Sequence, residues 1–134
     1  MTGILVDTNI LVDILTENEQ WLGWSAYQVA RLADHNKLFI NPIIYAEVSI
    51  PFDSIEELRL ALLDSDFKNL AFNQEVCFLA GKAFRAYRKR GGEKTLPLPD
   101  FFIGAQAAVE SLQLLTRDTK NYRTYFPTVE LIAP

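Results

Sequence analysis

Short apolar runs alternate with amphipathic stretches along the whole chain. The apolar runs have the length of buried strands, and the longer stretches place apolar residues at helical spacing. The strands that this pattern predicts are residues 3–6, 38–40, 67–72, 114–116 and 129–132. Because these strands alternate with helices, the pattern predicts an α/β protein with a central, mainly parallel sheet.

Capping residues predict where several helices begin and end. Asn41 before Pro42 is a typical helix start, residues 54–57 (SIEE) fit a capping box, and Gly91 with Gly92 ends a long helix. The predicted helices are residues 8–15, 19–36, 43–49, 54–63, 73–90 and 101–112. No repeat or long linker interrupts them, so we expect a single domain over residues 1–134.

Composition limits the kinds of partner. The 134 residues are 49% hydrophobic and 22% charged, as in a globular protein, and the net charge of −4 gives no overall attraction for nucleic acid. Any contact with nucleic acid must then depend on a local basic patch. A single cysteine, Cys77, excludes an intramolecular disulfide and suits a reducing compartment. With no signal-peptide pattern and no spanning apolar run, we expect a cytoplasmic protein without membrane contact.

Four carboxylates fall at similar points of this α/β pattern. Asp7 ends the first strand, Glu47 lies in the helix after the second, Asp100 is in the first turn of a helix, and Asp118 follows a strand. In a parallel sheet, the carboxyl ends of strands and the amino ends of the following helices share one edge. We therefore expect at least Asp7, Asp100 and Asp118 to converge there.

Crowded carboxylates need a counter-charge or a proton. Each like-charged pair costs about 4 kcal/mol at 4 Å with an effective dielectric near 20. The set offers oxygen ligands with no cysteine or histidine cluster, which favours Mg²⁺ or Mn²⁺ over zinc. The single histidine, His35, also makes a metal-independent ribonuclease with two catalytic histidines impossible within this chain.

A structural interpretation of the same residues is open. An aspartate before a helix is commonly its N-cap, which applies to Asp7 and Asp100. Asp118 could make an Asx turn, whereas Glu47 lies in an otherwise apolar helix and fits this interpretation less well.

Four segments in order resemble the motifs of PIN-domain ribonucleases. They are residues 4–13 (ILVDTNILVD), 45–48 (YAEV), 98–105 (LPDFFIGA) and 115–118 (LTRD). The length and the short tail are similar to the VapC toxins of toxin–antitoxin modules. This resemblance implies a PIN-like three-layer α/β/α fold and a Mg²⁺-dependent endoribonuclease, which is a hydrolase of RNA phosphodiesters.

The resemblance also implies roles for individual residues. It makes Asp7, Glu47, Asp100 and Asp118 the catalytic acidic quartet, with Asp7, Asp100 and Asp118 binding the Mg²⁺ or Mn²⁺. Thr8, Asn9 and Thr116 would be polar supports. The implied partners are an RNA substrate, a cognate antitoxin protein that covers the active site, and a second copy of the chain in a homodimer.

Basic residues in two regions of the chain are candidates for contact with the RNA backbone. Arg85 and Arg88 lie near the end of the long helix, where cations also favour the helix dipole. Arg117, Lys120 and Arg123 flank Asp118 and would meet the backbone if the acidic edge is the active site.

Other classes fit the sequence less well. A haloacid-dehalogenase-like phosphatase needs a second aspartate where this chain has Asn9, and a P-loop or dinucleotide-binding protein needs a glycine-rich turn after Val6. The alternative that stays open is a non-catalytic PIN-like protein-binding domain whose carboxylates are structural caps.

Overall fold

A five-stranded sheet forms the centre of the computed structural model, which describes residues 3–62, 66–95 and 98–134. The strands lie in the order β3-β2-β1-β4-β5, and each neighbouring pair is parallel. Their bounds are β1 Gly3–Val6, β2 Lys37–Ile40, β3 Phe67–Asn69, β4 Gln113–Leu115 and β5 Leu131–Ile132. The predicted parallel α/β sheet is thereby confirmed.

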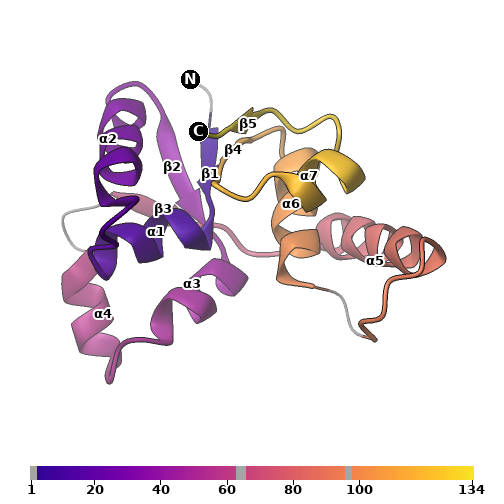
Figure 1. The fold of residues 1–134 in the computed structure, drawn as a ribbon, viewed down its shortest axis with the longest axis horizontal. Coiled ribbons are helices and arrows are strands. Elements are labelled where there is room, and N and C mark those ends of the chain that lie inside the picture. The colour runs from indigo at the N-terminus through magenta and orange to yellow at the C-terminus, as the bar shows by residue number, and fades with distance from the viewer. Residues whose placement is uncertain (1–2, 63–65, 96–97) are drawn as a thin grey trace.

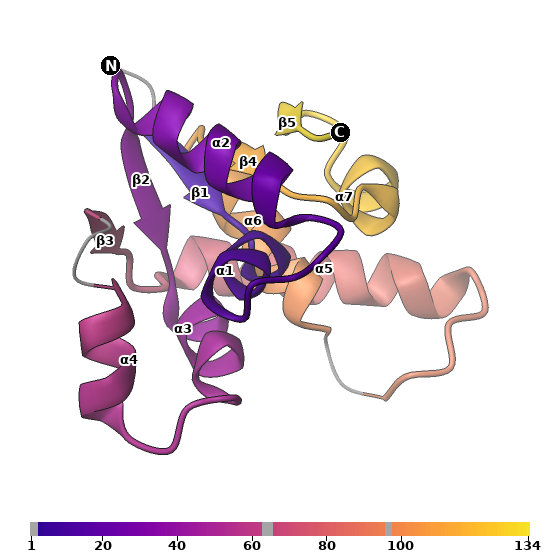
Figure 2. The same cartoon turned by 60° about the vertical axis from the view of Figure 1, so that its left-hand side comes forward.

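Helices cover both faces of this sheet (Figure 1). Their bounds are α1 Thr8–Leu15, α2 Leu22–Ala33, α3 Pro42–Ser49, α4 Ile55–Leu62, α5 Gln74–Lys89, α6 Pro99–Val109 and α7 Lys120–Tyr125. In both views α1 and α2 lie on one side of the sheet, and α5 and α6 lie on the other (Figures 1 and 2). Ile4, Leu5 and Val6 of β1 are fully buried between these layers, which explains why the strand is a continuous apolar run. The predicted three-layer arrangement is confirmed.

The caps predicted at Asn41 and Gly91 form, whereas the predicted capping box forms only in part: the Ser54 hydroxyl accepts the N–H of Glu57 at 3.1 Å, but the Glu57 carboxylate accepts the N–H of Asp53 instead of that of Ser54. The Oδ1 atom of Asn41 accepts the N–H of Ile44 at 2.9 Å, and that of Asn73 accepts the N–H of Val76 at 2.9 Å. Gly91 after α5 has a φ of 90°, a left-handed conformation that favours glycine. These contacts fix the starts of α3 and α5 and the end of α5.

Three helical regions differ from the prediction, one of them α6, which covers Pro99–Val109 instead of residues 101–112. The predicted helix over residues 19–36 is shortened to Leu22–Ala33, because Asn18 accepts the N–H groups of Gln20 and Trp21 in a turn before it. The short helix α7 was not predicted at all. Residue 63, the last of the predicted helix over residues 54–63, lies outside the described residues.

The strand order reverses at β1. From β1 the chain builds β2 and β3 on one side, then crosses to place β4 and β5 on the other. In open parallel sheets the crevice at such a reversal, beyond the carboxyl ends of the strands, is the usual ligand site. Here it lies where β1 and β4 end, next to Asp7 and Thr116.

A buried amide pair fixes the two helices that flank this crevice. Asn41 donates to the Oε1 atom of Gln106 at 2.9 Å, and Gln106 donates to the backbone carbonyl of Ala71 at 3.1 Å. Both side chains are at most 1% exposed. The pair joins the start of α3 to α6, the two helices that carry Glu47 and Asp100.

Within the described ranges, we find no helix with the length and apolarity that a membrane crossing requires.

Candidate active site

Asp7 is buried at the carboxyl end of β1, with 4% of its surface exposed. Its Oδ1 atom accepts the backbone N–H of Thr8 at 2.7 Å, so Asp7 does cap α1, as the structural interpretation predicted. Its Oδ2 atom accepts two hydroxyls at 2.8 Å, one from Thr116 and one from Tyr122. A cap uses one oxygen, so the two hydroxyls on Oδ2 are additional donors to this buried carboxylate.

Glu47 is linked to the neighbourhood of Asp7 by Thr8, the next residue along the chain. The Thr8 hydroxyl donates to the Oε1 atom of Glu47 at 2.7 Å, which joins the start of α1 to α3. Glu47 is half-buried and sits on the face of α3 that is turned toward Thr8. Thr8 therefore positions the carboxylate, which agrees with its predicted supporting role.

Asp100 lies in the first turn of α6 but is not its N-cap. The N-cap position is Leu98, and Asp100 receives its hydrogen bonds from α7 instead. Asn121 donates to Oδ2 at 3.2 Å, and the hydroxyl of Tyr122 lies 3.4 Å from Oδ1. The predicted cap is wrong for Asp100, because its side chain is turned toward α7 and away from its own helix.

Asp118 follows β4 in a tight turn. Its backbone N–H donates to the Thr116 hydroxyl at 3.1 Å, and its Oδ1 atom accepts the N–H of Lys120 at 3.4 Å, in the pattern of an Asx turn. The side chain is exposed. Asn9 lies between the two strand ends, since it donates to Thr116 at 3.3 Å and accepts the N–H of Arg117 at 3.1 Å.

All four carboxylates line one hollow of about 340 Å³. The elements that supply them meet beyond the ends of β1 and β4 (Figure 2). Sequence reasoning expected Asp7, Asp100 and Asp118 at one edge, and the structure brings Glu47 to the same hollow.

The electrostatics of the hollow favour bound cations. Burial and, to a smaller extent, the charge of Asp100 raise the pKa of Asp7 to about 6, against the lowering effect of its hydrogen bonds from Thr116, Tyr122 and Thr8. Burial and the charge of Asp118 raise the pKa of Asp100. Burial and the two carboxylates raise the pKa of the Tyr122 hydroxyl, which is therefore a hydrogen-bond donor at neutral pH.

The donor chemistry fits a hard divalent cation. Among the described residues, no three acidic, cysteine or histidine side chains are already arranged to hold a metal ion. Mg²⁺, however, commonly binds through one or two carboxylates and keeps several waters. Asp7 and Asp100, which share the hydroxyl of Tyr122, meet that requirement.

The guanidinium of Arg117 binds other residues of this chain. Its Nε and Nη2 atoms lie 2.7 and 2.8 Å from the two carboxylate oxygens of Asp13, and its guanidinium lies 4.8 Å from the centre of the Trp21 ring. Its role as an RNA contact stays a prediction, as it does for Arg85, Arg88, Lys120 and Arg123, which are exposed.

Sequence reasoning missed three residues of this region: Asp13, Asn121 and Tyr122. Asp13 is 1% exposed and also accepts the Ser25 hydroxyl at 2.7 Å. Tyr122 and Asn121 lie on α7, and the spacing of Tyr122, Tyr125 and Phe126 is the signal that could have predicted this helix.

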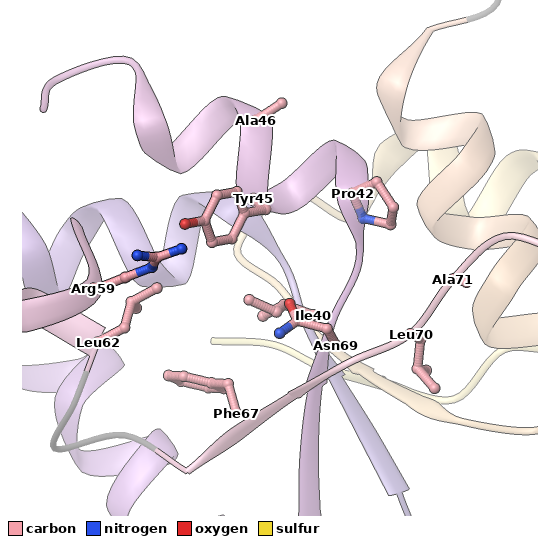
Figure 3. Close-up of a pocket in the computed structure, with 10 residues that line it drawn as sticks. All are labelled: Ile40, Pro42, Tyr45, Ala46, Arg59, Leu62, Phe67, Asn69, Leu70 and Ala71. Carbon is pink, nitrogen blue, oxygen red and sulfur yellow. The ribbon is translucent and has the colours of Figure 1, made fainter. Parts of the chain in front are cut away.

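A second hollow lies on the other side of α3. It measures about 930 Å³ and is mostly apolar, with Tyr45, Leu62 and Phe67 among its lining residues (Figure 3). Among the described residues, Arg59 is the single charged one that lines it, and its guanidinium points toward the hydroxyl of Tyr45. Because it holds none of the four carboxylates, it is not the site of the predicted chemistry.

The fold and the site define an α/β protein with an acidic crevice at the reversal point of a parallel sheet. The PIN domain family matches residues 4–127. The chain therefore belongs to this family, and the PIN-domain resemblance seen in the motifs is confirmed. No curated protein matches the sequence significantly.

Solved structures share the fold at low sequence identity. A chain of VapBC-1 from nontypeable Haemophilus influenzae matches with a TM-score of 0.74 and 22% identity, over 98% of both chains. A chain of VapBC2 from Rickettsia felis, bound to a DNA fragment from its promoter, matches with a TM-score of 0.72 and 20% identity, also over 98% of both. A toxin–antitoxin complex from Klebsiella pneumoniae matches with a TM-score of 0.64 and 26% identity, over 89% of both.

Proposed function

We propose that this protein is a metal-dependent endoribonuclease and the VapC-type toxin of a toxin–antitoxin pair. The observation that carries the proposal is the convergence of Asp7, Glu47, Asp100 and Asp118 on one hollow at the sheet reversal. Membership of the PIN domain family and the likeness to VapBC structures support it.

The residues of the hollow have different roles in the proposed hydrolysis of a phosphodiester. Asp7 and Asp100 offer oxygens to Mg²⁺ or Mn²⁺, and Asp118 adds a third, exposed carboxylate. When bound, the cation supplies a Lewis acid that activates water and stabilises charge on the phosphate and the leaving 3′ oxygen. Thr8 holds one oxygen of Glu47, which leaves Oε2 to orient the attacking water and accept its proton.

The test is cleavage of a panel of structured RNAs in Mg²⁺, Mn²⁺ or EDTA. Asp7→Asn keeps the shape of the side chain and its cap on α1 but removes the charge, so we expect cleavage to disappear in this variant. Glu130→Gln, an exposed carboxylate just before β5, is the matched control and should cut like the wild type. If Asp7→Asn cuts as well as the wild type, the activity comes from a contaminant.

The alternative function is a non-catalytic protein-binding domain. The cap made by Asp7 and the Asx turn made by Asp118 favour it, because both bonds would exist without any catalysis. It predicts a wild-type protein that neither cuts RNA nor binds metal. The additional donors on Asp7 and the bracing of Asp100 by α7 favour the nuclease instead.

We propose a cognate antitoxin protein as the partner. The structural neighbours come from toxin–antitoxin complexes, and the apolar hollow of Figure 3 is lined in part by α3, the helix that also carries Glu47. Adding the antitoxin at one molecule per molecule of this protein should abolish cleavage. It should also protect the backbone amides around this hollow from hydrogen exchange. The homodimer is a further expectation, which sedimentation of the purified protein tests.

A further inference from the structure

Tyr122 is buried, although its side chain ends in a hydroxyl. It is 1% exposed and lies in α7. A phenylalanine would fill the same space, and a buried hydroxyl is costly unless it finds a hydrogen-bond partner. Its oxygen lies 2.8 Å from Oδ2 of Asp7 and 3.4 Å from Oδ1 of Asp100. The hydroxyl therefore joins the end of β1 to the first turn of α6.

The hydroxyl of Tyr122 lies near two carboxylates but has one hydrogen to donate. A phenol donates a single hydrogen, and the shorter distance assigns it to Asp7. The next residue on the chain, Asn121, donates to the other oxygen of Asp100 at 3.2 Å. Adjacent residues of α7 thus hold one oxygen of each carboxylate: Tyr122 holds Oδ2 of Asp7, and Asn121 holds Oδ2 of Asp100.

The same contacts decide which oxygen of Asp7 is available. Oδ2 accepts the hydroxyls of both Thr116 and Tyr122, whereas Oδ1 accepts the N–H of Thr8 and retains a lone pair. We propose that Tyr122 is a positioning residue, which fixes Asp7 against Asp100 for a divalent cation and directs Oδ1 of Asp7 toward it. This inference rests on the proposed function only in taking Asp7 and Asp100 as the cation ligands.

A purely packing role does not account for Tyr122. The aromatic cluster of this region is formed by Phe84, Tyr87, Phe101 and Tyr125, whose ring centres lie 5.3 to 6.4 Å apart. Tyr125, three residues further along α7, packs its ring on Phe101 at 5.3 Å. It provides a matched control, because Tyr125→Phe removes a hydroxyl from the same helix away from the carboxylates.

The test is calorimetric titration of Mn²⁺ into the wild type, Tyr122→Phe and Tyr125→Phe in the absence of RNA. Partners that orient metal ligands are commonly worth 10- to 100-fold in metal affinity, so we expect Tyr122→Phe to bind Mn²⁺ on the order of 10-fold more weakly. Tyr125→Phe should bind like the wild type. Tyr122→4-aminophenylalanine, which restores a donor at the same place, should recover most of the affinity.

Cleavage kinetics provide the second measurement. At limiting Mn²⁺ the Tyr122→Phe variant should lose kcat with an unchanged KM for RNA, and excess Mn²⁺ should restore much of the rate. If Tyr122→Phe unfolds at a lower temperature but binds Mn²⁺ like the wild type, the hydroxyl is structural and the inference is overturned.

The outcomes separate this inference from the proposed function. A wild type that binds Mn²⁺ but cuts no RNA overturns the nuclease, while weaker binding by Tyr122→Phe still supports the positioning role. A wild type that cuts RNA, with Tyr122→Phe binding equally well, overturns only the positioning role. A wild type that binds no Mn²⁺ overturns both.

Discussion

Arg117 and Asp13 form a two-pronged ion pair beside the acidic hollow, with contacts of 2.7 and 2.8 Å. Asp13 is 1% exposed, and Arg117 stands between Thr116 and Asp118 in the sequence. The pair neutralises a fifth carboxylate of the hollow and anchors the turn after β4 to α1.

Replacing Arg117 should therefore lower stability. Arg117→Met leaves the buried Asp13 without its counter-charge, and we expect it to reduce the free energy of unfolding by about 3 kcal/mol. Asp13→Asn combined with Arg117→Met should recover part of the loss. Urea denaturation measures both, with the exposed Arg31→Met as the control. If Arg117→Met instead raises the KM for RNA at unchanged stability, Arg117 is a backbone contact.

The stability of the metal-free protein should fall as the pH rises through the range in which Asp7 titrates. The pKa of Asp7 is about 6 in the folded protein against 3.8 in the unfolded chain, so the folded state holds the proton more tightly. Between pH 4 and 7, Asp7→Asn should gain about 2 kcal/mol relative to the wild type, since each pKa unit is about 1.4 kcal/mol and this range covers most of the difference between the folded and unfolded pKa. Thermal and urea unfolding in EDTA at several pH values measure this.

Metal should reverse that pH dependence. Ionised Asp7 repels its neighbours without a cation but binds one when it is present, so saturating Mn²⁺ should stabilise the wild type more at pH 7 than at pH 5. Asp7→Asn should respond weakly at both values. Parallel pH profiles for the two proteins in EDTA would contradict the raised pKa.

The Thr8 hydroxyl should increase the rate of cleavage, because it holds the carboxylate of Glu47 in place. Thr8→Val keeps the shape of the side chain and removes the 2.7 Å bond, so Glu47 is no longer held. We expect a loss of kcat on the order of 10-fold, and Thr8→Ser should restore the rate. Thr124→Val removes an exposed threonine hydroxyl that donates to the carbonyl of Lys120, and it should leave kcat unchanged. Equal rates for Thr8→Val and the wild type would show that Glu47 needs no anchor.

The amide of Gln106 should contribute to stability. Gln106→Leu leaves the buried Nδ2 of Asn41 and the carbonyl of Ala71 without their partner, which should cost about 2 kcal/mol of unfolding free energy. Gln74→Leu, an exposed change at the start of α5, should cost much less. Equal denaturation midpoints for the two variants would argue that Asn41 finds another acceptor.

Particular elements show how far the sequence predicts this fold. The bounds of β1 and α1 were predicted as observed. The apolar run before Asp7 indicates the strand, and Asp7 itself marks the start of the helix. The length of α2 was overestimated because a single side chain, Asn18, competes with the helix for its first backbone N–H groups. Helix α7 was missed because its six residues carry too short an apolar pattern to stand out from a loop.

The sequence by itself determined the succession of strands and helices along the chain apart from α7, most of the caps and the four candidate carboxylates, since each depends on residues that are close together in the chain. Only the tertiary structure decided what those carboxylates touch. Tyr122 meets Asp7 across 115 residues and Arg117 meets Asp13 across 104, and contacts at such separations follow from strand order and helix packing. Local pattern predicts that an aspartate caps a helix or ends a strand, but its hydrogen-bond donors are supplied by distant elements that only the folded chain brings near.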